Sequence, residues 1–150
     1  MSKSAEYRQS FLETDGTEEE WAEHDIKIKV WYEVKSQSDR YLSLAVIAND
    51  NWTNSGYEAR YYNYDMEAAR WITIRDILDD AQIQAAEENI REQIKQREKE
   101  TGMQYWGDDW KGMDGNTKFY MNHKDNLVIV FERYEIAPGA AGAQEFEVTK

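Results

Sequence analysis

Apolar and polar residues alternate strictly along residues 26–34, and this pattern constrains the fold more than any other feature of the sequence. Every second residue is apolar: Ile26, Ile28, Val30, Tyr32 and Val34. A period of two places these side chains on one face of an extended chain, which predicts a half-buried antiparallel strand. A polar turn and a second apolar run over residues 41–48 follow, so we expect a β-hairpin.

The rest of the chain adds further strands and one long helix. Residues 56–64 have strand character. Residues 71–80 are expected to close with a short helix, for which Thr73 and Asp76 have the spacing of a capping box. Apolar residues recur every three or four positions over residues 81–101, which predicts a long helix that stops at Gly102. Strands are expected again over residues 118–122, 127–136 and 144–149. This order predicts the α+β class: an antiparallel or mixed β-sheet with one long and one or two short helices packed on one face.

The length of 150 residues fits one ordinary domain. Residues 1–23 are polar and acidic, and we expect a flexible N-terminal arm in which Thr17 and Glu20 cap one short turn. Residues 24–150 would form a single α+β domain, most simply a monomer. There is no signal peptide and no apolar run of about 18 residues, so if the protein is exported, this is an excised domain without its anchor.

The charge of the chain restricts its partners. Thirty acidic and 18 basic residues give a net charge of −12, which repels nucleic acids and anionic lipid surfaces and attracts a cationic partner. The chain has no cysteine, which excludes thiol catalysis and cysteine-ligated metals. His24 and His123 have no ligand-spaced neighbours, so we expect no metal and no cofactor.

The sequence contains no common hydrolase or nucleotide-binding motif, and we expect a protein that is not an enzyme. A glycosidase needs two carboxyl groups that face one cleft, whereas Asp108 and Asp109 are adjacent in sequence. The loop around them is nevertheless rich in aromatic residues, which stack on sugars. It offers a candidate glycan platform made of Tyr105, Trp106 and Trp110.

Residues 134–142 form the stiffest turn that the sequence predicts. Pro138 is the only proline and holds Ala137 extended, while Gly139 and Gly142 allow a close approach of another backbone. Such a turn between two core strands can present contacts to a partner, or it can simply connect the strands.

The same turn carries a resemblance to a known family. Phe119-Tyr120, the strand over residues 127–131, the run Tyr134-Glu-Ile-Ala-Pro-Gly139, Gly142 and the strand over residues 145–148 resemble the extracytoplasmic domain of RsiV-type anti-sigma factors, which also precedes the catalytic domain of PdaC-type peptidoglycan deacetylases. Upstream, Leu42-Ser43-Leu44 resembles the serine-bearing strand of the family, and residues 62–65 and 71–78 resemble its next block. The likeness covers residues 26–149. It departs at residues 55–59 and at Ala140-Ala141, where the family usually has an aromatic residue between the glycines.

The resemblance implies a sensor or binding domain outside the cytoplasm, anchored to the membrane or secreted in the full-length protein. In RsiV-type members this domain captures lysozyme, and capture exposes the anti-sigma factor to proteolysis that frees a sigma factor. The implied partner-binding residues are Ser43, Tyr134, Glu135, Ala137, Pro138, Gly139 and Gly142. The alternative that the resemblance implies is a peptidoglycan-binding accessory module of a cell-wall deacetylase, for which Tyr105, Trp106 and Trp110 are the candidate residues.

Overall fold

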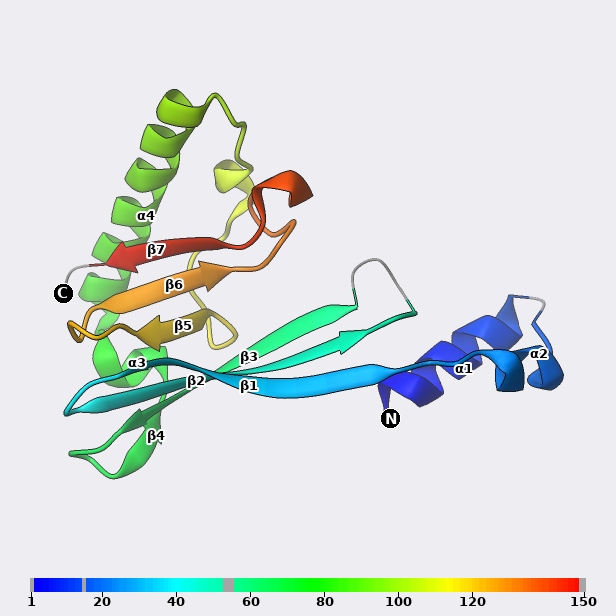
Figure 1. The fold of residues 1–150 in the computed structure, drawn as a ribbon. Helices are drawn as coiled ribbons and strands as arrows, with labels where there is room; N and C mark the ends of the chain where they lie inside the picture. Colours follow the sequence, from blue (N-terminus) through cyan, green and yellow to red (C-terminus); the bar gives the residue numbers. More distant parts are fainter. Residues whose placement is uncertain (1, 15, 53–55, 149–150) are drawn as a thin grey trace. The chain divides into compact units, whose positions relative to one another are not determined.

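The computed structural model describes residues 2–14, 16–52 and 56–148. The chain divides into two compact units, one made of Met1–Trp31 with Ile47–Ala59 and the other of Tyr32–Val46 with Arg60–Lys150. The α+β class is confirmed. The α-helices and strands, labelled in Figure 1, are α1 (Lys3–Glu13), α2 (Glu18–Glu23), β1 (Ile28–Gln37), β2 (Tyr41–Asp50), β3 (Tyr57–Asp65), β4 (Arg70–Ile72), α3 (Ile74–Ile77), α4 (Asp80–Thr101), β5 (Lys118–Met121), β6 (Leu127–Phe131) and β7 (Gln144–Val148). Two short 3-10 helices are η1 (Gly107–Asp109), between α4 and β5, and η2 (Gly139–Ala141), between β6 and β7.

The first unit contains helices α1 and α2, within the stretch for which the sequence predicts an N-terminal arm with one short capped turn. The Thr17–Glu20 capping box of α2 is confirmed, with Thr17 N–H donating to Glu20 Oε2 at 2.9 Å. Phe11, Trp21 and His24 pack around Trp52, with ring centroids 4.9–6.0 Å from that indole. Isolated helices this short are marginal, so these aromatic contacts stabilise the helices within the unit.

Strands β1 to β4 form one sheet in the order β1-β2-β3-β4, which places β1 at an edge. The alternating residues 28–34 do form a strand, but their apolar face is not buried: Val30 is 65% and Tyr32 is 70% exposed. The prediction of a half-buried strand is therefore wrong in its burial. Alternation fixes an extended chain, but it does not supply a second layer to cover the strand.

The β3–β4 hairpin and helix α3 are held by two aspartates. The N–H groups of Ala68 and Glu67 donate to Asp65 Oδ1, each at 3.0 Å, and together with Arg40 they hold the pKa of Asp65 below its usual range. The predicted capping box of α3 is confirmed: Asp76 accepts from the N–H of Thr73 at 2.7 Å and from its hydroxyl at 2.8 Å. These bonds, with the nearby Arg70, lower the pKa of Asp76 to about 2.

Strands β5 to β7 form a second, antiparallel sheet with β6 in the centre, and helix α4 contacts β7 (Figure 1). All five residues of β6 are buried. The apolar stripe predicted for α4 is also buried, and Gly102 ends the helix at φ 68° as predicted. These are the stripe residues: Ile83, Ala86, Ile90 and Ile94. No helix in the described ranges is both long enough and apolar enough to cross a membrane.

Candidate functional site

The chain leaves β6 through a tight turn that brings Tyr134 to the surface. Glu135 N–H donates to the carbonyl of Glu132 at 3.0 Å, and the Glu135 carboxylate accepts the N–H of Glu132 at 2.7 Å. Tyr134 lies between them at φ +70° and is 57% exposed. A bulky residue in the left-handed region is uncommon and costs free energy, and such strain is concentrated at functional positions. The turn therefore holds one large aromatic ring in solvent.

Gly139 and Arg133 fix the position of that ring. A β-carbon at residue 139 would overlap the Tyr134 side chain, so the ring lies directly against the Gly139 backbone. Arg133 donates its Nε–H to the Gly139 carbonyl at 2.7 Å, and its guanidinium lies 5.2 Å from the centroid of the Tyr134 ring. Because both neighbours restrain it, the exposed ring loses little conformational entropy when a partner covers it.

After this turn the chain forms the short helix η2, between Pro138 and Gly142. Pro138 is extended at φ −54° and its carbonyl accepts the N–H of Ala141 at 2.9 Å. Gly142 has φ 70° and ψ −164°, a conformation open essentially to glycine alone. We call residues 132–142 the corner. The partner-binding residues that the resemblance implies for the corner differ in exposure. Tyr134 and Glu135 are exposed, Pro138 and Gly142 are half-buried, and Ala137 and Gly139 are buried.

The aromatic loop lies beside the corner. Trp106 donates its backbone N–H to the carbonyl of Ile136 at 2.7 Å, and its side chain is 39% exposed. Asp108 and Asp109, two and three residues further on, are exposed as well. The structure thus brings together the two stretches that the sequence singled out separately, since the loop that carries an exposed indole and two exposed carboxylates is hydrogen-bonded to the corner.

The three predicted platform residues do not share one exposed face. Tyr105 is buried, and its hydroxyl donates to Gln144 Oε1 at 2.8 Å. Trp110 is half-buried and packs edge-on against Phe131, with 5.2 Å between the ring centroids. The guanidinium of Arg91 lies over the Trp110 ring, 4.7 Å from its centroid. Two of the rings therefore belong to the core, which leaves Trp106 as the exposed one.

Ser43 lies in the interior and not on the surface of the site. Its side chain is 0% exposed; its hydroxyl donates to Asn63 Oδ1 at 2.6 Å and accepts the N–H of Met121 at 3.0 Å. Asn63 in turn donates to the carbonyl of Phe119 at 2.9 Å. This buried network ties β2 and β3 to β5. Ser43 can therefore influence a partner only by holding the two sheets together, since its side chain is closed to contact.

Sequence reasoning missed Arg133, which restrains Tyr134, and Asn63 as the partner of Ser43. No pattern identifies Arg133, because its role depends on how the turn folds back. The burial of Ser43 did have a signal: it shares the inward face of β2 with Tyr41, Ala45 and Ile47. A small polar residue in such a row needs a buried hydrogen-bonding partner.

Asp108 and Asp109, the carboxylates considered for a glycosidase, are exposed, and so is Asp114 in the same loop. Asp114 is engaged within its own turn, where its Oδ1 accepts the N–H of Asn116 at 2.8 Å. Across residues 2–14, 16–52 and 56–148, no three or more histidine, aspartate and glutamate side chains gather closely enough to hold a metal ion.

Comparison with known proteins identifies relatives of this chain. Residues 75–150 match the family model described as a protein of unknown function, DUF3298. The anti-sigma-V factor RsiV of Bacillus subtilis (strain 168) is 30% identical over 124 residues, an alignment that covers 78% of this chain and 44% of that protein. The chain thus spans less than half the length of this relative.

Two solved structures share the fold. A DUF3298 family member from Bacteroides fragilis superposes with a TM-score of 0.66 at 19% identity, over 96% of this chain and 64% of the other. A DUF3298 family protein from Pseudomonas aeruginosa superposes with a TM-score of 0.61 at 14% identity, over 95% of this chain and 64% of the other.

Proposed function

Because this chain is an RsiV-type domain of the DUF3298 family, we propose that it is a non-enzymatic, extracytoplasmic binding domain that captures a cationic protein of the lysozyme type. In the longer protein to which such a domain belongs, capture would be the signal that the remainder transmits. The exposed, restrained Tyr134 ring carries the proposal, because rigid surface aromatics are the residues around which protein interfaces concentrate their binding energy.

Charge supports the choice of partner. The chain carries a net charge of −12, and Glu135, Asp108 and Asp109 expose carboxylates on the corner and on the adjoining loop. Lysozymes are strongly basic, so opposite charges would speed their encounter with this surface and orient them on it. The apolar contact would then come from Tyr134 and Trp106.

The peptidoglycan-binding alternative has weaker support. A glycan platform needs several exposed rings on one face, and of the three rings predicted for it, Trp106 alone is exposed. Binding to purified cell wall that does not change with salt would favour this alternative over protein capture.

A titration of the labelled domain with lysozyme at low and at moderate salt tests the proposal. We expect saturable one-to-one binding that weakens as salt is added, because screening reduces the attraction between opposite charges. Absence of binding at both salt concentrations would remove lysozyme as the ligand.

A further inference from the structure

Three aromatic side chains gather on one side of the β3–β4 hairpin, in the second unit (Figure 1). Tyr64 and Trp71 are cross-strand partners and Tyr62 lies two residues before Tyr64, so all three rings are on the same side of the sheet. The Trp71 ring centroid lies 5.1 Å from that of Tyr64 and 6.2 Å from that of Tyr62. Trp71 is 56% exposed, Tyr62 is 42% exposed and Tyr64 is half-buried. We call these three residues the hairpin face.

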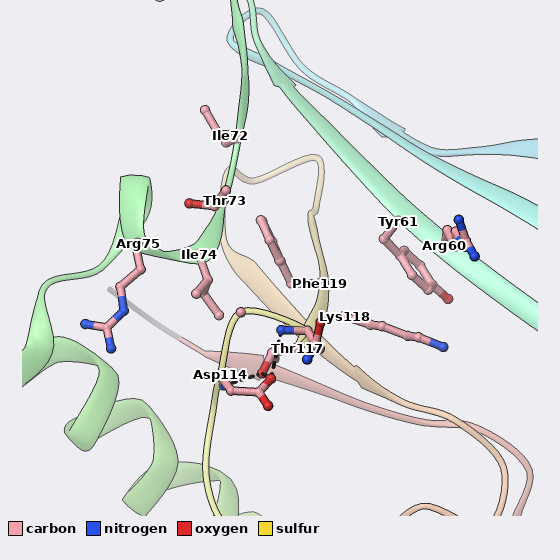
Figure 2. Close-up of a pocket in the computed structure, with 12 residues that line it drawn as sticks. Arg60, Tyr61, Ile72, Thr73, Ile74, Arg75, Asp114, Thr117, Lys118 and Phe119 are labelled. Atoms are coloured by element: carbon pink, nitrogen blue, oxygen red, sulfur yellow. Dashed lines mark hydrogen bonds between the residues drawn. The ribbon is translucent and has the colours of Figure 1, made fainter.

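The core occupies the opposite side of the hairpin. Asn63 and Ile72 are the residues that alternate with the three rings, and both are buried. Ile72 lines a cavity of about 410 Å³ together with Ile74 and Phe119 (Figure 2). Because successive strand residues point to opposite sides, packing of the core accounts for Asn63 and Ile72 but not for the outward rings. Adjoining aromatic rings that the core does not require are typical of a recognition surface.

The hairpin face has almost no charge around it, although the chain carries a net charge of −12. In β2 and β3, residues that face the core alternate with outward residues, and the outward ones share the side of the hairpin face. Within the second unit these further outward residues are Leu42, Leu44, Val46 and Arg60. Arg60 is the one charged residue among them, and it already has an interaction partner. A face of this kind favours a neutral ligand over a cationic one.

The chemistry of the three rings matches the surface of a sugar. Each ring has an apolar face and a hydrogen-bonding group at its edge, which is a hydroxyl in Tyr62 and Tyr64 and an indole N–H in Trp71. The contacts of Trp71 with the two tyrosines are edge-on, at interplanar angles of 71° and 77°, and such contacts cover less ring face than stacking does. A pyranose ring likewise has C–H groups on its face and hydroxyls around its rim.

The exposed ring area suits a short glycan better than a protein partner. The exposed fractions of Tyr62 and Trp71 add up to about one whole aromatic side chain, which is roughly 150–250 Å². The half-buried residues beside them add less each. A stable protein–protein interface needs about 800 Å² from each partner, so a second copy of the chain would find too little contact area here.

We propose that the hairpin face binds a neutral glycan chain, with successive sugar rings against Tyr62, Tyr64 and Trp71. Two sources have this chemistry: a plain glucan and a glycan of N-acetylated sugars. The proposal does not depend on lysozyme capture, because it involves neither Tyr134 nor Trp106.

Spectra of the isotope-labelled full chain, titrated with neutral oligosaccharides, test the proposal, because each tryptophan indole N–H gives a signal of its own. The probes are cellohexaose and chitohexaose, and the controls are glucose and N-acetylglucosamine. We expect saturable shifts of the Trp71 indole signal and of the Tyr62 and Tyr64 amides, equal at low and moderate salt because no charge is involved. The single sugars are expected to bind more weakly by about tenfold or more, because one ring removes less apolar surface from water.

The two oligosaccharides distinguish the sources. Saturation by cellohexaose alone identifies a plain glucan, saturation by chitohexaose alone identifies an N-acetylated glycan, and saturation by both identifies the shared sugar ring. No saturable shift, or shifts confined to the Trp106 indole, overturns the proposal. Shifts of the same signals when the protein is concentrated without sugar also overturn it, since they identify a second copy of the chain as the occupant.

A matched pair of tryptophan variants locates the contact. Trp71→Ala is expected to weaken oligosaccharide binding by about tenfold or more. Trp106→Ala, the same change at the exposed indole beside the corner, is expected to leave this binding unaltered. If Trp106→Ala loses as much affinity as Trp71→Ala, the hairpin face is not the site. The titrations of the parent chain do not depend on whether either variant folds.

Discussion

Replacing Tyr134 with alanine is expected to weaken lysozyme binding by about 30-fold or more while the domain stays folded. The ring is 57% exposed and is restrained by Gly139 and Arg133, so its removal takes away preorganised contact area and leaves the core unchanged. Truncating a central aromatic residue of an interface typically costs about 2 kcal/mol or more, which corresponds to this loss of affinity. Isothermal titration of the parent and variant domains measures the difference.

The matched control is Tyr62→Ala, which removes the same side chain from the exposed face of β3, where Tyr62 is 42% exposed. It is expected to change the affinity for lysozyme by less than about twofold, since most residues outside the central contacts are nearly neutral. If Tyr134→Ala binds as tightly as the parent, or if Tyr62→Ala loses as much, the corner is not the contact surface.

Replacing Ser43 with alanine is expected to lower the free energy of unfolding by roughly 2–4 kcal/mol. The change leaves the Met121 N–H and Asn63 Oδ1 without their partner in the core, and each unsatisfied buried group costs about 1–3 kcal/mol. Urea unfolding measures the effect. Ser10→Ala is the control, because Ser10 is exposed on α1 and is expected to change stability by no more than about 0.5 kcal/mol.

The same variant separates the two roles that Ser43 could have in the family. A structural role predicts that lysozyme binding by Ser43→Ala falls only in proportion to the unfolded fraction. A direct contact predicts unchanged stability together with lost affinity, and that pair of results would contradict the buried network described above.

Local signals in the sequence predicted most of the secondary structure. The stripe of α4 and the glycine that ends it, the capping boxes of α2 and α3, and the strand pairs all depend on residues close in sequence. What failed depends on distant contacts. Nothing in residues 26–34 shows that no layer covers β1. The contact of Trp52 with Trp21 in α2 likewise joins residues that are distant in sequence.

The site was predicted in part for the same reason. The Tyr134–Gly139 motif indicated a turn after β6, and Pro138 and Gly142 indicated that this turn is rigid. The motif could not separate surface residues from supporting ones. Ser43 lies in the interior, Ala137 and Gly139 are buried, and Tyr105 packs in the core, because folding places neighbouring residues of one motif at different depths.

Hydrogen–deuterium exchange of the domain with and without lysozyme tests the central claim most directly, since it locates the contact without any substitution. Our account predicts that slowed exchange concentrates on residues 132–142 and on the Trp106–Asp109 loop, with the exchange of β1 unchanged. A complex that forms but protects other segments, and leaves the backbone around Tyr134 exchanging at its original rate, would contradict the account.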